Sequence, residues 1–167
     1  MWVRTAAEAD LKAVHELLLT TWSASFDDIL GKEIVKTITN EWHSLSALKA
    51  NLKRPYSEFL VADDGKGRII GMAYAHQETR ETASLNQLYV LPEEQIKGVG
   101  STLLDEIETA FPGVNAMKLE VLEVNSRARR FYEQKGYSQI GRNAEWGSLN
   151  FKEPVLILQK SLNAWVM

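Results

Sequence analysis

The chain has 167 residues, of which 45% are hydrophobic and 25% charged, a size and balance typical of one globular domain. Its net charge of −3 favours no nucleic-acid partner, and the absence of cysteine excludes disulfides, thiol catalysis and cysteine-based zinc sites. The three histidines are widely scattered, no apolar run approaches the roughly 20 residues of a membrane span, and the N-terminus lacks a secretory core. We therefore expect a single cytoplasmic domain over residues 1–167, with no metal, no membrane and no nucleic acid as partner.

The first half of the chain predicts a short strand followed by helices. Residues 1–4 can form a strand, and apolar side chains recur at helical spacing from Leu11 to Trp22. A connecting segment is expected at residues 21–28. A second helical region extends roughly over residues 32–52, with a break before Ser44, which can cap a new helix.

The second half predicts strands with two further helices. Strands are expected at residues 58–62, 68–77, 83–91, 116–124, 137–141 and 155–160, and helices at residues 100–110 and 125–135. A right-handed crossover through the helix at 100–110 makes the strands before and after it parallel. This order indicates an α/β (α+β) fold, with a mixed, mostly antiparallel central sheet flanked by helices.

The strongest chemical signal is an apolar strand that leads through a loop with two glycines directly into a helix. The N–H groups at a helix start lack partners and carry partial positive charge, so they attract phosphate. Gly98 and Gly100 lack Cβ atoms, which lets phosphate oxygens approach the backbone. A Walker loop is excluded because Lys97 precedes Gly98, and a dinucleotide fingerprint lacks its third glycine at Leu103. Taken alone, the two glycines would also fit a loop that binds nothing.

Two sequence blocks resemble the GNAT superfamily of N-acetyltransferases. The run Gln-x-x-Gly-x-Gly at residues 95–100, after a strand ending in Val-x-Pro, resembles its acyl-CoA signature. The run Asn-x-x-Ala-x-x-Phe-Tyr-x-x-x-Gly-Tyr at residues 125–137 resembles the family's second block at the expected distance. The resemblance is strong over residues 85–141 and weak before residue 57, and Ile96 stands where many members have glycine.

The resemblance implies a GNAT-like fold and an enzyme that moves the acetyl group of acetyl-CoA to a primary amine of a small molecule or peptide. Direct attack in a ternary complex agrees with the absence of cysteine, because a thiol acyl-enzyme cannot form. The pyrophosphate would lie on backbone N–H groups of Gln95, Ile96, Lys97, Gly98, Val99, Gly100, Ser101 and Thr102. The pantetheine arm would pair with the strand at Leu88, Tyr89 and Val90, where the Val90 N–H would polarise the thioester carbonyl.

Two residues of the second block have both a structural and a functional interpretation. Asn125 can cap the following helix or hydrogen-bond the pantetheine arm through its amide. Tyr132 lies at helical spacing from Ala128, which fits core packing, whereas in the family this position faces the cofactor sulfur. The resemblance therefore implies that Tyr132 is a general acid for the departing thiolate.

The base that removes a proton from the amine is not evident from the sequence. A free alkyl amine has a pKa of about 10.4, so it must lose a proton before attack. Many relatives place a glutamate eleven residues before the loop glutamine, and this position holds Ser84. The remaining candidates are Glu78 or Glu81, Ser84 or Asn86 acting through a water, or no dedicated base.

In the GNAT fold the region between the first two helices usually lines the acceptor pocket, so the resemblance implies that residues 21–28 line it here. Trp22 and Phe26 are candidate pocket walls, although Trp22 also lies on the apolar stripe of the first helix. Asn86 is a candidate on the central strand, and Tyr74 and His76 are further candidates on the sheet.

Two alternatives stay open at the level of the sequence. The missing glutamate also fits a non-catalytic acyl-CoA-binding regulatory module, whereas the retained Tyr132 favours an enzyme. The apolar C-terminal residues 162–167 can cover an edge of the core or bury themselves in a homodimer.

Overall fold

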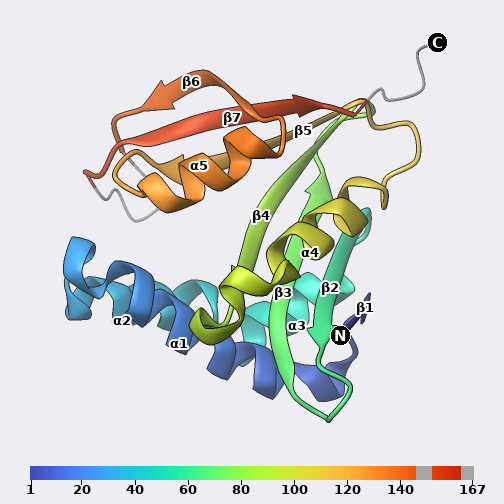
Figure 1. The fold of residues 1–167 in the computed structure, drawn as a ribbon, viewed down its shortest axis with the longest axis vertical. Coiled ribbons are helices and arrows are strands. Elements are labelled where there is room, and N and C mark those ends of the chain that lie inside the picture. The colour runs from blue at the N-terminus through green and yellow to red at the C-terminus, as the bar shows by residue number, and fades with distance from the viewer. Residues whose placement is uncertain (146–151, 163–167) are drawn as a thin grey trace. The chain divides into compact units, whose positions relative to one another are not determined.

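The computed structural model describes residues 1–145 and 152–162 and contains two compact units (Figure 1). The first unit consists of Met1–Ala75 and Gln87–Ala110, and the second of His76–Asn86 and Phe111–Met167. Two strands, β3 (Ile69–Gln77) and β4 (Thr82–Val90), contain unit boundaries, so each contributes to both units.

The first unit combines an N-terminal group of helices with strands. Its further elements are β1 (Trp2–Thr5), the 3-10 helix η1 (Glu8–Asp10), α1 (Leu11–Leu30), α2 (Lys32–Trp42), α3 (Leu45–Lys53), β2 (Ser57–Asp63), the 3-10 helix η2 (Pro92–Lys97) and α4 (Val99–Glu108). β1 pairs antiparallel with β2, and α4 packs against both strands. On β3, Gly71 makes room for α4, because a Cβ atom there would lie 2.9 Å from Leu103 Cδ1 and 3.2 Å from Val99 Cγ1.

Local sequence signals explain where α2 and α3 begin and end. The side-chain oxygen of Ser44 accepts a hydrogen bond from the Ala47 N–H at 3.1 Å, which confirms the predicted cap between the two helices. Gly31 separates α1 from α2 with φ of 87°, a left-handed backbone that glycine adopts without steric cost.

The predicted connecting segment at residues 21–28 is wrong, because α1 continues through it to Leu30. Phe26, which we expected in a loop, lies in this helix and is 5% exposed. Trp22, Phe26 and Leu30 recur every fourth residue and extend the apolar stripe that begins at Leu11. The helix therefore ends where Gly31 breaks it, two repeats of the stripe beyond Trp22.

The second unit contains β5 (Ala116–Leu122), α5 (Ser126–Gln134), β6 (Ser138–Asn143) and β7 (Val155–Ser161), together with the first part of β4. β4 and β5 are parallel, from Thr82 opposite Ala116 to Leu85 opposite Leu119, which confirms the predicted crossover. β7 pairs antiparallel with β5 on one side and with β6 on the other. The last strand is thus inserted between two earlier ones.

Hydrogen bonding gives the strand order β1-β2-β3-β4-β5-β7-β6 in a mixed sheet of seven strands, and the predicted fold class is confirmed. Each strand and helix expected in the second half of the sequence is present, with ends shifted by a few residues. Residues 163–167, to which the expectation of a covered core edge or a homodimer mainly refers, lie outside the described residues.

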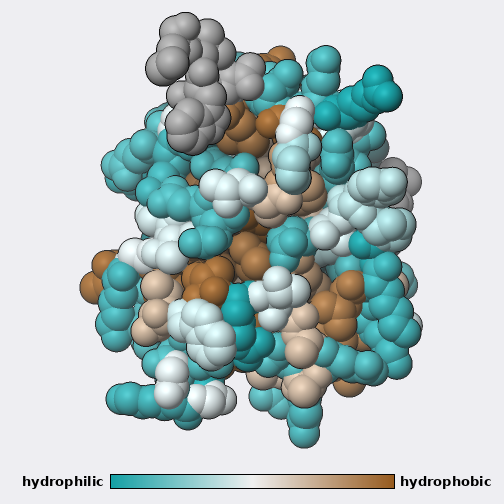
Figure 2. Space-filling view, turned by 90° about the vertical axis from the view of Figure 1, so that its right-hand side faces the viewer, coloured by the Kyte–Doolittle hydropathy of each residue, from teal (hydrophilic) through white to brown (hydrophobic). Residues whose placement is uncertain are grey.

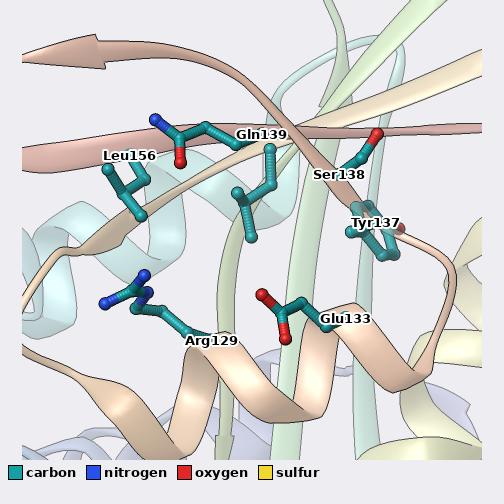
Figure 3. A pocket seen from close by; sticks show the side chains of 7 residues that line it. Arg129, Glu133, Tyr137, Ser138, Gln139 and Leu156 are labelled. Atoms are coloured by element: carbon teal, nitrogen blue, oxygen red, sulfur yellow. The ribbon is translucent and has the colours of Figure 1, made fainter.

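The two faces of the sheet differ within the second unit. α5 lies over the face that carries Leu156 and Leu158, since Arg129 of α5 lines a cavity with both leucines (Figure 3). Side chains alternate along a strand, so the opposite face carries Lys118 and Glu120 of β5. In register with β5, this second face also carries Ser84 and Gln159. Of these four polar side chains, Lys118 and Gln159 are half-exposed, Glu120 is exposed and Ser84 is buried, and we call this side of the second unit its polar face.

Hydrophilic residues cover most of the face seen in Figure 2, with hydrophobic residues in smaller patches between them. This distribution is usual for a folded chain, because polar atoms cannot cover its whole surface. In the part of the chain that the structure describes, no helix combines the length and the apolar character needed to cross a membrane.

Candidate functional site

The loop before α4 is held in place by its own glutamine. Gln95 Nε2 donates a hydrogen bond to the Val90 carbonyl at 3.0 Å, which ties the 3-10 helix η2 to the end of β4. Gly98 then adopts φ 81° and ψ 9°, a left-handed conformation that turns the chain into α4. Among the described residues, nothing lies within 4 Å of a Cβ built on Gly98, so the space beside this backbone is open.

The start of α4 presents backbone N–H groups that the helix itself does not use. The first intrahelical bond runs from the Thr102 N–H to the Gly98 carbonyl at 3.1 Å. The N–H groups of the four residues before Thr102 therefore have no acceptor within the helix, which is the general property of a helix start. No side chain in residues 1–145 or 152–162 caps this end. Anion binding there is favoured by these donors and by the helix dipole.

Three residues of the predicted phosphate loop have contacts or an exposure that bear on their expected roles. Thr102 donates its N–H and its hydroxyl to the Gly98 carbonyl, so its backbone donor is not available for a pyrophosphate, contrary to expectation. The ammonium of Lys97 pairs with the Glu94 carboxylate at 3.1 Å. Ile96 is 89% exposed, which agrees with a position free to vary in the loop pattern.

The end of β4 lies against an aromatic cluster in the first unit. Leu88 and Tyr89 are half-buried and Val90 is buried. The Tyr89 ring lies 5.9 Å from the Trp22 ring, which in turn lies 4.5 Å from Phe26. Burial raises the pKa of the Tyr89 hydroxyl, and a hydrogen bond with Trp22 opposes the shift.

Trp22 and Phe26 contribute to the core of the first unit. Trp22 is 1% exposed, as expected from the apolar stripe of α1, whereas the burial of Phe26, which is 5% exposed, was not expected. Their contact with an acceptor amine stays a prediction.

His43 is a buried titratable residue to which the sequence assigned no role. It is 1% exposed and its ring lies 5.1 Å from the Trp22 ring. Burial, with a smaller contribution from His15, lowers the pKa of His43 to about 4. Within the described residues its Nδ1 has no hydrogen-bond partner. His43 follows the last residue of a helix, and nothing in the sequence there indicates that its side chain is buried. Its burial is seen only in the tertiary structure.

In the second unit, Asn125 and Tyr132 are placed by α5. The Asn125 Oδ1 accepts a hydrogen bond from the Ala128 N–H at 3.2 Å, which confirms its interpretation as a helix cap. Tyr132 is 9% exposed, and its ring packs edge-on against Phe131 at 5.2 Å and Tyr137 at 5.6 Å. The Tyr137 N–H donates to the Tyr132 carbonyl, which ends the helix beside these rings.

The candidate bases gather into two polar contacts on the second unit's polar face. Ser84 donates its hydroxyl to Glu78 Oε1 at 2.5 Å, and Lys118 Nζ lies 3.6 Å from Glu78 Oε2. His76 Nδ1 and Asn86 Oδ1 are 2.6 Å apart. Glu81 lies in the exposed turn before β4, so the carboxylate that the structure brings to Ser84 is Glu78.

A cavity of about 210 Å³ lies between α5 and the strands β6 and β7 (Figure 3). Its lining residues are Arg129, Glu133, Tyr137, Ser138, Gln139, Leu156 and Leu158. Figure 3 shows Arg129 and Glu133 on successive turns of the helix, below the side chains of the strands. None of the predicted site residues lines this cavity.

The predicted site residues are thus divided between the units. The first unit holds Trp22, Phe26, the end of β4 and the loop at residues 95–102. The second unit holds Glu81, Ser84, Asn86, Asn125 and Tyr132.

Comparison with known proteins identifies the chemistry. The sequence model of the Acetyltransferase (GNAT) family matches residues 11–137. The chain belongs to this family. The chain is 29% identical over 152 residues to a probable N-acetyltransferase of Mycobacterium tuberculosis. This match covers 89% of the chain and 86% of the relative.

Solved GNAT structures share the fold over nearly the whole chain. The PaiA N-acetyltransferase from Thermoplasma acidophilum, in complex with coenzyme A, matches with a TM-score of 0.84 at 23% identity and covers 96% of this chain and 98% of its own. Ard1 from Thermoplasma volcanium matches with a TM-score of 0.75 at 19% identity and covers 96% of each chain.

Membership of the GNAT family makes this chain an acetyl-CoA-dependent N-acetyltransferase. The matched residues include the loop before α4 and the helix α5, the two segments on which the resemblance was based. The family match therefore agrees with the two GNAT-like segments recognised in the sequence, at residues 95–100 and 125–137.

Proposed function

We propose that the chain transfers the acetyl group of acetyl-CoA to a primary amine of a small molecule or peptide by direct attack, with both substrates bound together. The observation that carries this proposal is the start of α4, where the left-handed turn at Gly98 leads into backbone N–H groups that have no acceptor within the helix. These donors fit the pyrophosphate of acetyl-CoA. The structural neighbour PaiA, which is in complex with coenzyme A, supports the same ligand.

Each segment of the loop has a separate task in this proposal. The N–H groups of Gly98, Val99 and Gly100 bind phosphate oxygens, joined by that of Ser101 and the preceding loop residues. The Gln95 side chain keeps the loop attached to β4, so binding acts on a preorganised backbone. Lys97, already paired with Glu94, adds positive charge near this position.

The residues of β4 and α5 would orient the reacting thioester, which supplies an activated acyl carbon and a thiolate leaving group. The backbone of Leu88, Tyr89 and Val90 would pair with the pantetheine arm, and the Val90 N–H would stabilise charge that develops on the carbonyl oxygen. The Asn125 cap uses Oδ1, so its Nδ2 would donate to the arm. Tyr132 would give a proton to the leaving thiolate.

The decisive experiment measures release of coenzyme A from acetyl-CoA in the presence of a panel of amines and peptides. We expect at least one primary amine to raise turnover well above the slow hydrolysis of acetyl-CoA and to yield an N-acetylated product detected by mass spectrometry. Tight binding of acetyl-CoA without any amine-dependent turnover would overturn the proposal. The alternative, a chain that binds acyl-CoA without transferring the acetyl group, predicts that second result.

With an acceptor in hand, Tyr132→Phe tests the general acid. We expect kcat to fall by about tenfold to a hundredfold, near the low end for general acid–base catalysis, because a thiolate whose acid has a pKa of about 8.5 leaves readily. The KM for acetyl-CoA should change little. Tyr137→Phe removes a hydroxyl from the neighbouring ring and is the matched control; an equal loss in both variants would indicate a packing effect.

A further inference from the structure

The three histidines of the chain lie in different environments. His43 is buried in the core of the first unit. His15 is half-buried on α1 and its Nδ1 contacts the His43 carbonyl at 2.6 Å. His76 is half-buried at the end of β3, where its Nδ1 lies 2.6 Å from the Asn86 Oδ1. His43 lies beside the candidate residues Trp22 and Tyr89 but is buried, whereas His76 is half-buried on the sheet and contacts the side chain of Asn86.

The contact with Asn86 determines which nitrogen of His76 carries the proton. A carbonyl oxygen only accepts hydrogen bonds, so His76 Nδ1 donates to Asn86 Oδ1. A neutral imidazole has a single N–H, and with that hydrogen on Nδ1 the other nitrogen, Nε2, holds a lone pair. The amide of Asn86 thus favours the tautomer in which Nε2 is a proton acceptor.

His76 lies among polar side chains of the second unit. Asn86 and Ser84 are two residues apart on β4 and therefore share one face of the sheet. The charged groups on this face are Glu78 beside Ser84, and Lys118 and Glu120 on the neighbouring strand β5. Asn86 and Glu120 are exposed, so an amine from solvent can reach this face.

Glu78, the other candidate on this face, is already engaged. Its Oε1 accepts the Ser84 hydroxyl at 2.5 Å, and its Oε2 lies 3.6 Å from the Lys118 ammonium. Proton transfer to Glu78 would neutralise the charge that Lys118 pairs with, whereas proton transfer to His76 leaves both contacts in place. The geometry therefore favours the imidazole over the carboxylate.

We propose that His76 is the general base of this acetyltransferase, accepting a proton of the attacking amine at Nε2, and that Asn86 is a positioning residue that holds the imidazole in the required tautomer. This role rests on the proposed function. In the step, the amine nitrogen forms a bond to the acetyl carbon and the C–S bond breaks, with its electron pair leaving on sulfur. The amine proton goes to His76 Nε2 and then to water.

Steady-state kinetics of His76→Gln test the base directly. We expect kcat/KM for the amine to fall by about a hundredfold or more, the usual size of a general-base contribution, while the Kd for acetyl-CoA stays unchanged. The pH profile of kcat/KM should also differ between the unaltered chain and His76→Gln, because the variant lacks the proposed proton acceptor. His15→Gln is the matched control and should keep the rate and the pH profile.

Variants of Asn86 separate positioning from simple packing. Asn86→Leu removes the acceptor for Nδ1–H and should lower kcat by about tenfold or more. Asn86→Asp keeps an acceptor oxygen and should restore most of the rate. Equal losses in the leucine and aspartate variants would overturn the positioning role. Circular dichroism and the free energy of unfolding of each variant exclude misfolding as the cause.

A long-range ¹H–¹⁵N NMR spectrum supplies a readout that does not depend on activity. At a pH where His76 is neutral, we expect Nδ1 to be protonated and Nε2 unprotonated, and Asn86→Leu should shift the tautomer population toward Nε2–H. A protonated Nε2 in the unaltered chain would overturn the assignment. If the unaltered chain acetylates amines and His76→Gln retains its kcat/KM, the base role fails while the proposed function stands. If no amine is acetylated, both fail.

Discussion

Two residues, Gln95 and Gly98, determine the shape of the loop before α4. Gln95 and Val90 join the loop to β4 through a side-chain hydrogen bond, and Gly98 supplies a backbone conformation that other residues rarely adopt. The signature glutamine and glycine thus determine the shape of the loop, and the proposed contacts with the ligand are made by its backbone N–H groups. Loss of shape and loss of binding should therefore go together at Gly98.

Gly98→Ala should destabilise the protein by about 1–2 kcal/mol, the cost of placing an L-residue in the left-handed region. It should also weaken acetyl-CoA binding, because relief of the strain moves the N–H groups at the start of α4. Gly113→Ala is the matched control, since Gly113 has φ 83° and, like Gly98, no described atom within 4 Å of the position that a Cβ would take. Urea unfolding and calorimetric titration with acetyl-CoA measure the two effects. Equal affinities in both variants would contradict the role of Gly98 in binding.

Burial of His43 makes the free energy of unfolding depend on pH. Its pKa is about 4 in the folded state, whereas an exposed histidine in the unfolded chain has a pKa of about 6.5. Below pH 6.5 the unfolded state therefore binds a proton that the folded state does not, so stability falls as pH falls toward 4. The loss approaches about 3 kcal/mol for this residue.

The measurement for His43 is the free energy of unfolding at pH 7 and at pH 4.5. His43→Leu removes the titrating group and also the buried Nδ1, so the difference between the two pH values should shrink in this variant. Carboxylates contribute to the same range of pH, and the comparison between the variant and the unaltered chain isolates the histidine. An unchanged difference would contradict burial of a neutral imidazole.

At the scale of elements, the helix starts differ in how their N–H groups are satisfied. α3 and α5 begin with side-chain caps, from Ser44 and Asn125, which satisfy one of their own N–H groups. α1, α2 and α4 begin without a side-chain cap in the described part of the chain. The missing cap alone therefore does not assign a ligand to α4, and the proposed anion site there also depends on the left-handed turn at Gly98.

Asn125 is predicted to combine a cap with a ligand contact, and two substitutions separate them. Asn125→Ala should cost about 1 kcal/mol of stability, whereas Asn125→Asp keeps the capping oxygen and should cost little. Both lack Nδ2 and should weaken acetyl-CoA binding about fivefold, as expected for a net hydrogen bond of about 1 kcal/mol. Ser44→Ala, which removes the α3 cap, is the control and should change stability alone. An aspartate variant that binds acetyl-CoA normally would leave Asn125 with the cap only.

For the whole molecule, the two units are interleaved along the chain rather than consecutive. The chain leaves the first unit within β3, returns to it within β4 and leaves it again after α4. A boundary inside a strand differs from a flexible linker, where domain boundaries normally fall. We therefore propose that the chain folds as the single domain expected from its length.

Cooperative unfolding tests this proposal. Transitions in urea followed by far-ultraviolet circular dichroism and by tryptophan fluorescence should coincide, because two-state unfolding gives the same midpoint for every probe. Hydrogen exchange of β2 in the first unit and β5 in the second should report one common free energy of opening. Separate midpoints, or protection lost in one unit at a time, would show independent domains.

The sequence by itself determined the fold class, most strands and helices, and the cofactor. The fold class and the elements follow from local signals, namely apolar periodicity and the Ser44 cap, whereas the cofactor follows from the resemblance of residues 95–100 and 125–137 to the GNAT family. The loop predicted at Phe26 was wrong because the apolar stripe does not stop at Trp22, and Trp22 and Leu30 flank Phe26 at helical spacing.

Only the tertiary structure decided which polar side chains meet. The pairs His76 with Asn86 and Ser84 with Glu78 depend on the register of the hairpin formed by β3 and β4, which the conformation of its turn sets and which the order of residue types alone does not show. The burial of His43 and the insertion of β7 between β5 and β6 likewise arise from contacts distant in sequence. The loop proposed to bind the acetyl donor could be found in the sequence because its donors are consecutive backbone N–H groups, whereas the proposed base could not, because its two side chains come from two strands.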